Sequence, residues 1–404
     1  MDNFGYIFLL FLMLYVLYVS GKALRESQNL LSVAGISAIV VYTFNEGLRF
    51  GRGIDYNLYG NDYENFARTG DSGQNFGFMF VEKCLITLDM PWQVCVCLMS
   101  FTFILGTLYL LKKQFLSVLP YALPFFVLLS MSRVENMVRW YFGFSFIMAG
   151  LSYQIIGNKK IEKEFVLFSI LGCTIHYALL PIPFLLYLFS LNKKTIMHPL
   201  ISIPLFFIIA LSFQTSIMME VSNIANILFS VSEKFEHYGD DVEYWLTGGF
   251  AGADRTVFPG ISELLFLCVL TYAGYKPCRT LGGAYLYAYN LYLIGFITLP
   301  IARQIELFSR FNAIFYFFGA IVFAVIIEYG YIRKTISFGT PIIYLGVLLT
   351  FLNFGRVKIS EPLYGNPDFY LYVWNKGNRT YDEMYHIMIS NLVYGTSKVT
   401  KNSE

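Results

Sequence analysis

Residues 165–191 read FVLFSILGCTIHYALLPIPFLLYLFSL, and this stretch without a charged side chain decides the class of the fold. A bilayer core about 30 Å thick requires roughly 20 apolar residues for one helix. Lysines flank the stretch at 159–163 and 193–194. Because lysine-rich loops face the cytoplasm, both flanks should lie on one side of the membrane. We therefore predict a re-entrant or short-helix hairpin broken near Pro181 and Pro183; the alternative is one ordinary span beside a misleading lysine pair.

The composition of the whole chain indicates a lipid environment. Charged residues make up 14% of the 404 residues, hydrophobic residues make up 56%, and the mean hydropathy is +0.55. Soluble domains carry about 25% charged residues. The comparison excludes a soluble enzyme, a disordered chain and a secreted disulfide scaffold. The net charge of +2 gives no indication of nucleic-acid binding.

Apolar runs recur along the whole chain. They lie at residues 4–20, 30–44, 91–111, 115–131, 137–156, 165–191, 199–218, 258–275, 281–301, 311–329 and 336–354. Each of the other runs is long enough, within a few residues, for one crossing, whereas residues 165–191 are too few for two full helices. We predict an all-α polytopic integral membrane protein in which residues 1–404 form a single transmembrane domain. It would have about ten full transmembrane helices plus the hairpin, or about twelve helices in all.

The basic residues in the short loops predict the orientation. The clusters are Lys22/Arg25, Lys112/Lys113, Lys159/Lys160/Lys163, Lys193/Lys194, Lys276/Arg279 and Arg333/Lys334. The positive-inside rule places all of them in the cytoplasm, so both termini face outward. Three polar regions then lie outside: a first outer loop at 45–89, a second outer loop at 220–257 and a tail at 355–404.

Arginine is concentrated on the predicted outer side, where positive charge opposes insertion. The residues are Arg49, Arg52, Arg68, Arg133, Arg139, Arg255, Arg303 and Arg310. A guanidinium binds phosphate through two parallel hydrogen bonds and stays charged. We therefore predict an outer site for a phosphate or pyrophosphate. The alternative is that these arginines anchor helix ends among lipid headgroups or pair with outer carboxylates. If their segment is one helix, Arg303 and Arg310 share one face.

The ordered motifs of the chain resemble the EpsG family of Wzy-type polysaccharide polymerases. The first motif is Arg49-x-x-x-Gly53-x-Asp55-Tyr56-x-x-Tyr59, after the second apolar run. The second is Arg139 at the start of a helix, followed by Lys159/Lys160 and by His176-Tyr177-Ala178-Leu179. The third is Arg310 with Tyr316 at the start of a late apolar run.

The resemblance implies a GT-C-like enzyme of the bacterial inner membrane with its active site facing the periplasm. It would join oligosaccharide repeat units carried on undecaprenyl pyrophosphate, as in the biosynthesis of O-antigen, capsule or exopolysaccharide. Arginines can stabilise the leaving pyrophosphate without a metal ion or cofactor. We expect this role for a set of five residues: Arg49, Arg52, Arg139, Arg303 and Arg310.

An acceptor hydroxyl that attacks an anomeric carbon benefits from a general base. Asp55 is the first candidate, because it lies in the loop with Arg49 and Arg52. It could equally orient one of these arginines through a salt bridge. His176 is the second candidate, because it lies near the middle of the predicted hairpin and an intramembrane histidine is a functional hypothesis. A packing role for His176 is the alternative.

Aromatic residues on the outer side are candidates for sugar binding, since their rings pack on the apolar faces of sugars. They are Tyr56 and Tyr59 in the first outer loop and Tyr244 and Trp245 in the second. The second loop could instead form an amphipathic helix that lies on the membrane. The tail, which is rich in tyrosine, either closes over the outer face or is a surface appendage.

Two other functions fit parts of the pattern. A transporter or flippase for lipid-linked oligosaccharides would also need an anion site, but the chain lacks inverted-repeat symmetry. A membrane O-acyltransferase would use an arginine and a histidine nearer the cytoplasmic face. For a polymerase, the expected partners are the lipid-linked oligosaccharide, the bilayer and a chain-length regulator, with no nucleic acid.

Overall fold

The structure is a computed structural model that describes most of the chain. The described residues are 2–51, 54–154, 156–212, 259–304, 306–329, 371–373, 380, 381 and 383. Arg52, the second outer loop with Tyr244 and Trp245, the run at 336–354 and most of the tail lie outside this set. The chain divides into two compact units: residues 1–193 with 338–391, and residues 194–337 with 392–404.

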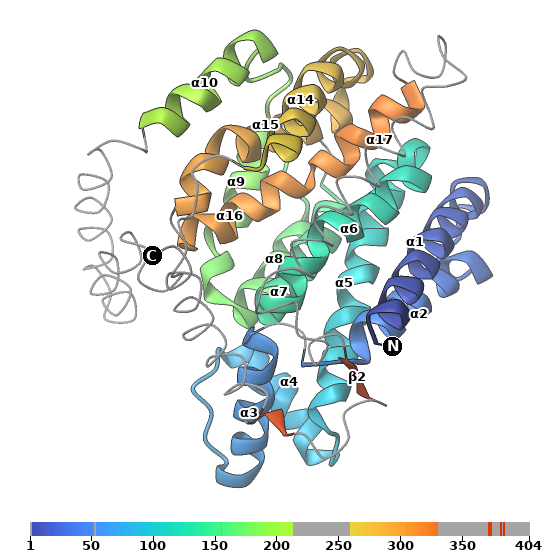
Figure 1. Cartoon of the computed structure of the whole chain (residues 1–404), viewed down its shortest axis with the longest axis vertical. Helices are drawn as coiled ribbons and strands as arrows, with labels where there is room; N and C mark the ends of the chain where they lie inside the picture. Colours follow the sequence, from blue (N-terminus) through green and yellow to red (C-terminus); the bar gives the residue numbers. More distant parts are fainter. Residues whose placement is uncertain are drawn as a thin grey trace, which may run out of the picture. The chain divides into compact units, whose positions relative to one another are not determined.

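Unit 1 is built from nine described helices and a two-stranded sheet (Figure 1). Its helices are α1 (Asp2–Ser27), α2 (Val33–Gly47), α3 (Ile54–Thr69), α4 (Phe76–Thr87), α5 (Trp92–Gln114), α6 (Leu119–Asn136), α7 (Val138–Leu151), α8 (Lys163–Ile175) and α9 (Pro181–Ser190). Short 3₁₀ turns, η1 (Leu116–Val118) and η2 (Tyr177–Leu179), precede α6 and α9. The strands are β1 (Arg49–Phe50) and β2 (Leu371–Tyr372).

Unit 2 contains a second set of helices. They are α10 (Pro199–Ser212), α14 (Ile261–Leu281), α15 (Gly283–Gln304), α16 (Glu306–Phe317) and α17 (Gly319–Tyr329). The amide Nδ2 of Asn312 in α16 donates to the carbonyl oxygen of Gly295 in α15 at 2.7 Å. A Cβ atom on Gly295 would lie 2.5 Å from the backbone nitrogen of Tyr316. Helices α15 and α16 therefore form a tight hairpin.

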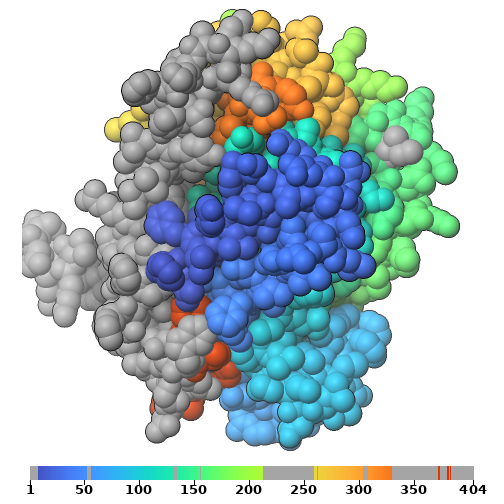
Figure 2. Space-filling view, turned by 90° about the vertical axis from the view of Figure 1, so that its right-hand side faces the viewer, coloured from blue at the N-terminus to red at the C-terminus, as the bar shows by residue number. Residues whose placement is uncertain are grey.

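The predicted membrane character is confirmed in outline. Four helical segments among the described residues are long and apolar enough to cross a bilayer: 8–27, 92–114, 283–303 and 308–329. Shorter apolar helices cover 116–130, 177–190 and 199–212. Figure 2 shows α1 and α2, in dark blue, on the surface of unit 1, and their exposed side chains include Phe8, Tyr15 and Val40. The predicted total of about ten or twelve helices stays a prediction.

The run at 165–191 folds back on itself, as predicted. Helix α8 ends at Ile175, η2 turns the chain, and α9 starts at Pro181. At the open end, the backbone N–H of Gly157 donates to Ser190 at 2.7 Å, and the hydroxyl of Tyr187 donates to the carbonyl of Lys159 at 2.6 Å. The run is therefore a short-helix hairpin, and its break lies just before Pro181.

The first outer loop, predicted only as a polar region, contains β1, α3 and α4 and has a core. Its apolar side chains pack on the ends of α5 and α7 in one cluster: Phe50, Tyr56, Tyr63, Phe78, Trp92, Cys95, Val96, Met99, Val138, Phe142, Ile175 and Tyr381. An alternation of polar and apolar residues at helical spacing hides this core from a plain hydropathy profile.

The described part of the tail packs on the first outer loop. Strand β2 pairs antiparallel with β1, with Tyr372 opposite Arg49. The hydroxyl of Tyr372 donates to Asn45 Oδ1 at 2.7 Å. The ring of Tyr381 lies 5.5 Å from that of Phe50, measured between centroids. For these residues, the tail is therefore part of the fold of unit 1.

Helices α7 and α8 approach closely through two glycines. A Cβ atom on Gly143 would lie 2.7 Å from the carbonyl oxygen of Gly172, and one on Gly172 would fall against the carbonyl oxygen of Gly143. Small residues at a helix interface let two backbones come together in a membrane protein. This contact positions α7 against the hairpin.

We predict that Gly172→Ala destabilises unit 1 although alanine favours helix. The added methyl group has to push α7 and α8 apart, and overpacking of this kind costs about 1–3 kcal/mol. The measurement is thermal unfolding of the detergent-solubilised protein. Gly73→Ala is the control, because no atom lies within 4 Å of a Cβ atom at Gly73. Equal melting temperatures for both variants would contradict the prediction.

Candidate functional site

Arg139, in the first turn of α7, is held by aromatic rings. Its guanidinium carbon lies 4.0 Å from the ring centroid of Tyr59 and 5.6 Å from that of Phe78. Its Nη2 donates to the hydroxyl of Tyr59 at 2.9 Å. Its buried Nε has no hydrogen-bond partner, and Arg139 forms no ion pair within the described part of the chain. The stacking therefore fixes the guanidinium while donors remain available.

Two carboxyl groups lie within electrostatic reach of Arg139. Burial raises the pKa of Asp62, against the opposing effects of Arg139 and of a hydrogen bond from Gln74 at 3.1 Å. Burial also raises the pKa of Glu82 to about 8; Arg139 lowers it and Asp62 raises it. At neutral pH, Glu82 is therefore mostly protonated.

Glu82 is the most deeply buried member of this group. Glu82 is only 1% exposed, and its Oε1 has no hydrogen-bond partner among the described residues. Tyr59, Asp62 and Arg139 are partly exposed. We call these four residues the Arg139 cluster. It combines a fixed cation, an aromatic face and two carboxyl groups, which are groups that recognise anions and hydroxyls.

Arg49 and Tyr56 help to hold the first outer loop in place. Arg49 is fully buried, its Nη1 donates to the backbone oxygen of Glu46 at 2.7 Å, and it forms an ion pair with the Glu46 carboxylate at 3.5 Å. The hydroxyl of Tyr56 lies 3.0 Å from the backbone oxygen of Arg49 and 2.9 Å from Gln93 Oε1. Gln93 in turn donates to the carbonyls of Gly47 and Arg49. This network holds β1 against α2 and α5.

The two candidate bases lie at element boundaries. Asp55 is the second residue of α3, and its side chain lies outside the described set. His176 is the C-cap of α8, at the turn of the hairpin. Neither residue is placed by a described contact with the Arg139 cluster.

The two late arginines belong to different helices, so the prediction that they share one helical face is wrong. Arg303 is in the last turn of α15 and Arg310 is in α16, and these two helices pack against each other. Arg303 pairs with Glu263 of α14 at 4.0 Å. The hydroxyl of Tyr316 donates to the same carboxylate at 3.4 Å. The Nε of Arg310 is buried and has no hydrogen-bond partner in the structure as described.

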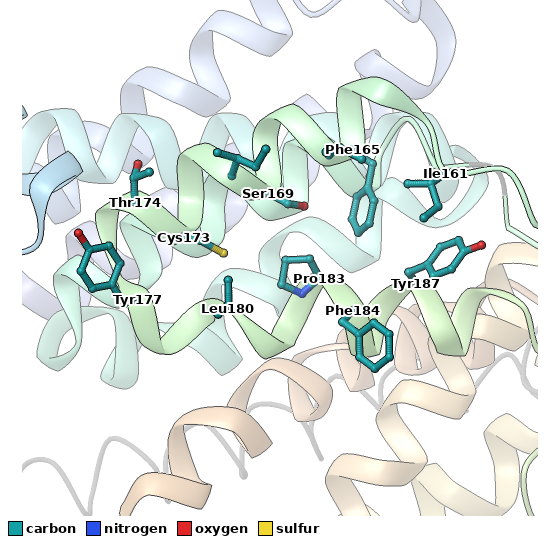
Figure 3. Close-up of a pocket in the computed structure, with 12 residues that line it drawn as sticks. Ile161, Phe165, Ser169, Cys173, Thr174, Tyr177, Leu180, Pro183, Phe184 and Tyr187 are labelled. Carbon is teal, nitrogen blue, oxygen red and sulfur yellow. The ribbon is translucent and has the colours of Figure 1, made fainter. Parts of the chain in front are cut away.

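A separate apolar groove lies between α8 and α9. Its volume is about 510 Å³, and Phe165, Cys173, Leu180 and Phe184 line it (Figure 3). The two helices run side by side with the groove between them (Figure 3). None of the site residues predicted from the sequence is among the residues that line it.

Sequence reasoning missed Asp62, Glu82 and Glu263. Glu82 carried a usable signal, since it stands in the apolar segment FGFMFVEKCLIT of α4. A carboxyl group in such a segment is costly unless it has a structural or functional partner. Asp62 and Glu263 carry no comparable local signal.

We predict that Glu82 makes the protein less stable as the pH rises. Its pKa in the folded protein, about 8, is above the ordinary value of 4.5, so folding favours the protonated form. The stabilisation is complete below pH 4.5 and is lost as the pH rises through 8. At about 1.4 kcal/mol per pKa unit, the limit is about 5 kcal/mol.

Thermal unfolding in detergent between pH 5 and pH 9, compared with Glu82→Gln, measures this contribution. The difference in melting temperature, wild type minus Glu82→Gln, should fall across that range, because the amide does not titrate. A difference that is constant with pH would show that Glu82 ionises in the folded protein as it does in water.

Comparisons with known proteins agree with the motifs. The model of the EpsG family matches residues 32–357, which include Arg49, Arg139 and Arg310. Searches of curated proteins and of solved structures found no significant match. The resemblance stated from the motifs is thus confirmed, and the match indicates a membrane protein of the polysaccharide-polymerase type. Since the match spans most of the sequence, the chain belongs to the EpsG family.

Proposed function

We propose that this protein polymerises oligosaccharide repeat units carried on undecaprenyl pyrophosphate, at the periplasmic face of the bacterial inner membrane. The proposal rests on the environment of Arg139. The ring of Tyr59 fixes its guanidinium, and its buried Nε has no partner among the described residues. Membership of the EpsG family and the apolar helices support it. The bilayer and the lipid-linked oligosaccharide are the partners, and a chain-length regulator is a further proposed partner.

The chemistry is the transfer of a glycosyl group to a hydroxyl. The acceptor hydroxyl attacks the anomeric carbon of the growing chain, and the bond from that carbon to the pyrophosphate oxygen breaks. Negative charge grows on the pyrophosphate in the transition state. Donors that are already in place stabilise this charge more than they stabilise the bound substrate. Guanidinium groups can therefore supply the positive charge that the reaction requires.

The arginines differ in how available their donors are. Arg139 and Arg310 are partly exposed, whereas Arg49 is fully buried beside Glu46, although the Nε of all three lacks a hydrogen-bond partner among the described residues. We assign a pyrophosphate contact first to Arg139. Arg49, Arg52, Arg303 and Arg310 remain candidates for such a contact, each proposed by itself. Tyr59, with Tyr56, Tyr244 and Trp245, is proposed for sugar binding, and Asp55 and His176 remain candidate bases.

Deletion of the gene in its native cluster tests the activity itself. A polymerase mutant should accumulate lipid-linked single repeat units, and the wild-type gene should restore long chains. Sizing of the lipid-linked glycan by gel electrophoresis measures this. Loss of all outer-face glycan would instead favour a flippase, and full-length polymer from the deletion strain would refute the proposal.

We predict that Arg139→Lys lowers polymerisation by about 100-fold, the loss typical for one donor to a developing anion. Lysine keeps the charge but loses the planar fork and the stacking on Tyr59. The measurement is turnover of purified protein with lipid-pyrophosphate oligosaccharide. Arg68→Lys is the matched control, because Arg68 is exposed on α3 and donates hydrogen bonds to Glu64 and Asn65 of the same helix. Equal rates for the two variants would remove Arg139 from the site.

For Arg310, the same assay separates an anion contact from a headgroup anchor. If Arg310 binds the leaving pyrophosphate, Arg310→Lys should reduce kcat strongly and KM less, because the contact strengthens in the transition state. An anchor among headgroups needs only a long cationic side chain, so lysine would serve nearly as well. Wild-type kcat from Arg310→Lys would therefore rule out a contact between Arg310 and the leaving pyrophosphate.

A further inference from the structure

A buried carboxyl group in the Arg139 cluster has no role in the scheme above. Glu82 is 1% exposed, and its Oε1 forms no hydrogen bond with the part of the chain that the structure describes. Buried polar atoms without a partner are rare, and each one calls for an explanation. Glu82 also stands in the middle of an apolar helix, where a leucine or glutamine would pack at lower cost.

Glu82 faces charged or titratable groups from several elements. Helix α4 packs against α3, α5 and α8. The groups coupled to Glu82 are Asp62 and Tyr63 of α3, Cys95 of α5 and Arg139 of α7, while His176 follows α8. Arg139 supplies the positive charge that acts on Glu82, and Asp62 supplies a negative one.

Among the buried atoms without a partner in the described residues, two in the Arg139 cluster are chemically complementary. Arg139 Nε is a donor and Glu82 Oε1 is an acceptor, and they do not bond to each other. Both belong to groups whose charges interact. A ligand that presents an anionic oxygen to Arg139 and a hydroxyl to Glu82 would satisfy both atoms. The proposed reaction brings together such a pair: a pyrophosphate oxygen and an acceptor hydroxyl.

We propose that Glu82 is the general base of the polymerase and takes the proton of the acceptor hydroxyl while Arg139 holds the leaving pyrophosphate. This inference rests on the proposed function. It adds a catalytic residue that the motifs did not indicate, and it places the base beside the arginine that is fixed by Tyr59.

The step balances without another reactant. The acceptor oxygen forms a bond to the anomeric carbon, and its proton moves to the Glu82 carboxylate, directly or through one water molecule. The bond between the anomeric carbon and the pyrophosphate oxygen breaks, and its electron pair leaves with undecaprenyl pyrophosphate. Glu82 then returns its proton to the solvent or to the departing pyrophosphate.

Among the carboxyl groups of the cluster, Glu82 fits the role better than Asp62. Asp62 is already bonded to Gln74 through Oδ2, which orients it and occupies that oxygen. Glu82 has a free oxygen, and its pKa of about 8 makes it a stronger base than an ordinary carboxylate. Proton transfer is most efficient when the pKa of the base lies near the working pH.

The test compares the pH dependence of polymerisation by the wild type, Glu82→Gln and Asp55→Asn. With the purified full chain and lipid-pyrophosphate oligosaccharide, wild-type kcat should rise with pH and level off near pH 8. Glu82→Gln should lose activity by roughly 10²- to 10⁴-fold, and its residual rate should lack the rising limb. Asp55→Asn should retain that limb.

Two comparisons separate a base from a packing residue. Glutamine has the shape of protonated Glu82 and does not titrate, so Glu82→Gln should unfold at or above the wild-type temperature at pH 6, and a loss of activity there is not a loss of fold. Asp71→Asn, a change at an exposed position, is the matched control and should leave rate and pH profile unchanged. If Glu82→Gln fails to fold, Glu82→Asp is used in its place. The rising limb of its kcat profile should then lie at a different pH from that of the wild type.

The outcomes distinguish this inference from the proposed function. Wild-type protein that forms no polymer would overturn both. If the wild type forms polymer and Glu82→Gln has the same rate and the same rising limb, the role of Glu82 is overturned and the proposed function stands. If Glu82→Asp is used instead, a rising limb at the same pH as in the wild type would also overturn the role of Glu82.

Discussion

The backbone of this protein must satisfy its own hydrogen bonds wherever lipid surrounds it, since hydrocarbon offers neither donors nor acceptors. Long apolar runs therefore become helices, and the one run with lysines at both ends becomes two short helices. The turn between them is a 3₁₀ turn whose amides bond back to the preceding carbonyls, as Leu179 does to His176 at 3.0 Å. Polar chemistry is thereby left to the segments outside the long helices, above all the first outer loop.

That loop can hold charged groups because it has a core of its own. Aromatic residues from α3, α4 and α5 pack together with Tyr381 of the tail. Arg139 enters the edge of this core and is held by the ring of Tyr59 instead of a carboxylate. An arginine neutralised by an ion pair would have little attraction left for an anion. Stacking fixes the group, and its donors stay available to a ligand.

The buried carboxyl groups near Arg139 complete the electrostatic balance of the loop. Two ionised carboxylates and one guanidinium at an interface of helices would carry a net negative charge, which burial disfavours. Protonation of Glu82 at neutral pH removes that charge. The same cluster can thus exist without ligand as a nearly neutral group and respond to an anion or to a rise in pH.

The sequence by itself determined the membrane class, the approximate positions of the apolar helices outside the first outer loop, the hairpin at 165–191 and the family. Composition, run length and lysine placement are local properties, and they suffice for these results. The motif around Arg139 also indicated a functional arginine. Only the tertiary structure decided that Glu82 and Asp62 lie beside Arg139. It also decided that Arg49 is buried and that its strand pairs with that of Tyr372, which is far away in the sequence. It also placed Arg303 and Arg310 on separate helices. The physical reason is that these contacts depend on close packing between distant segments, at glycines such as Gly143 and Gly172, and no local periodicity records which segments will meet.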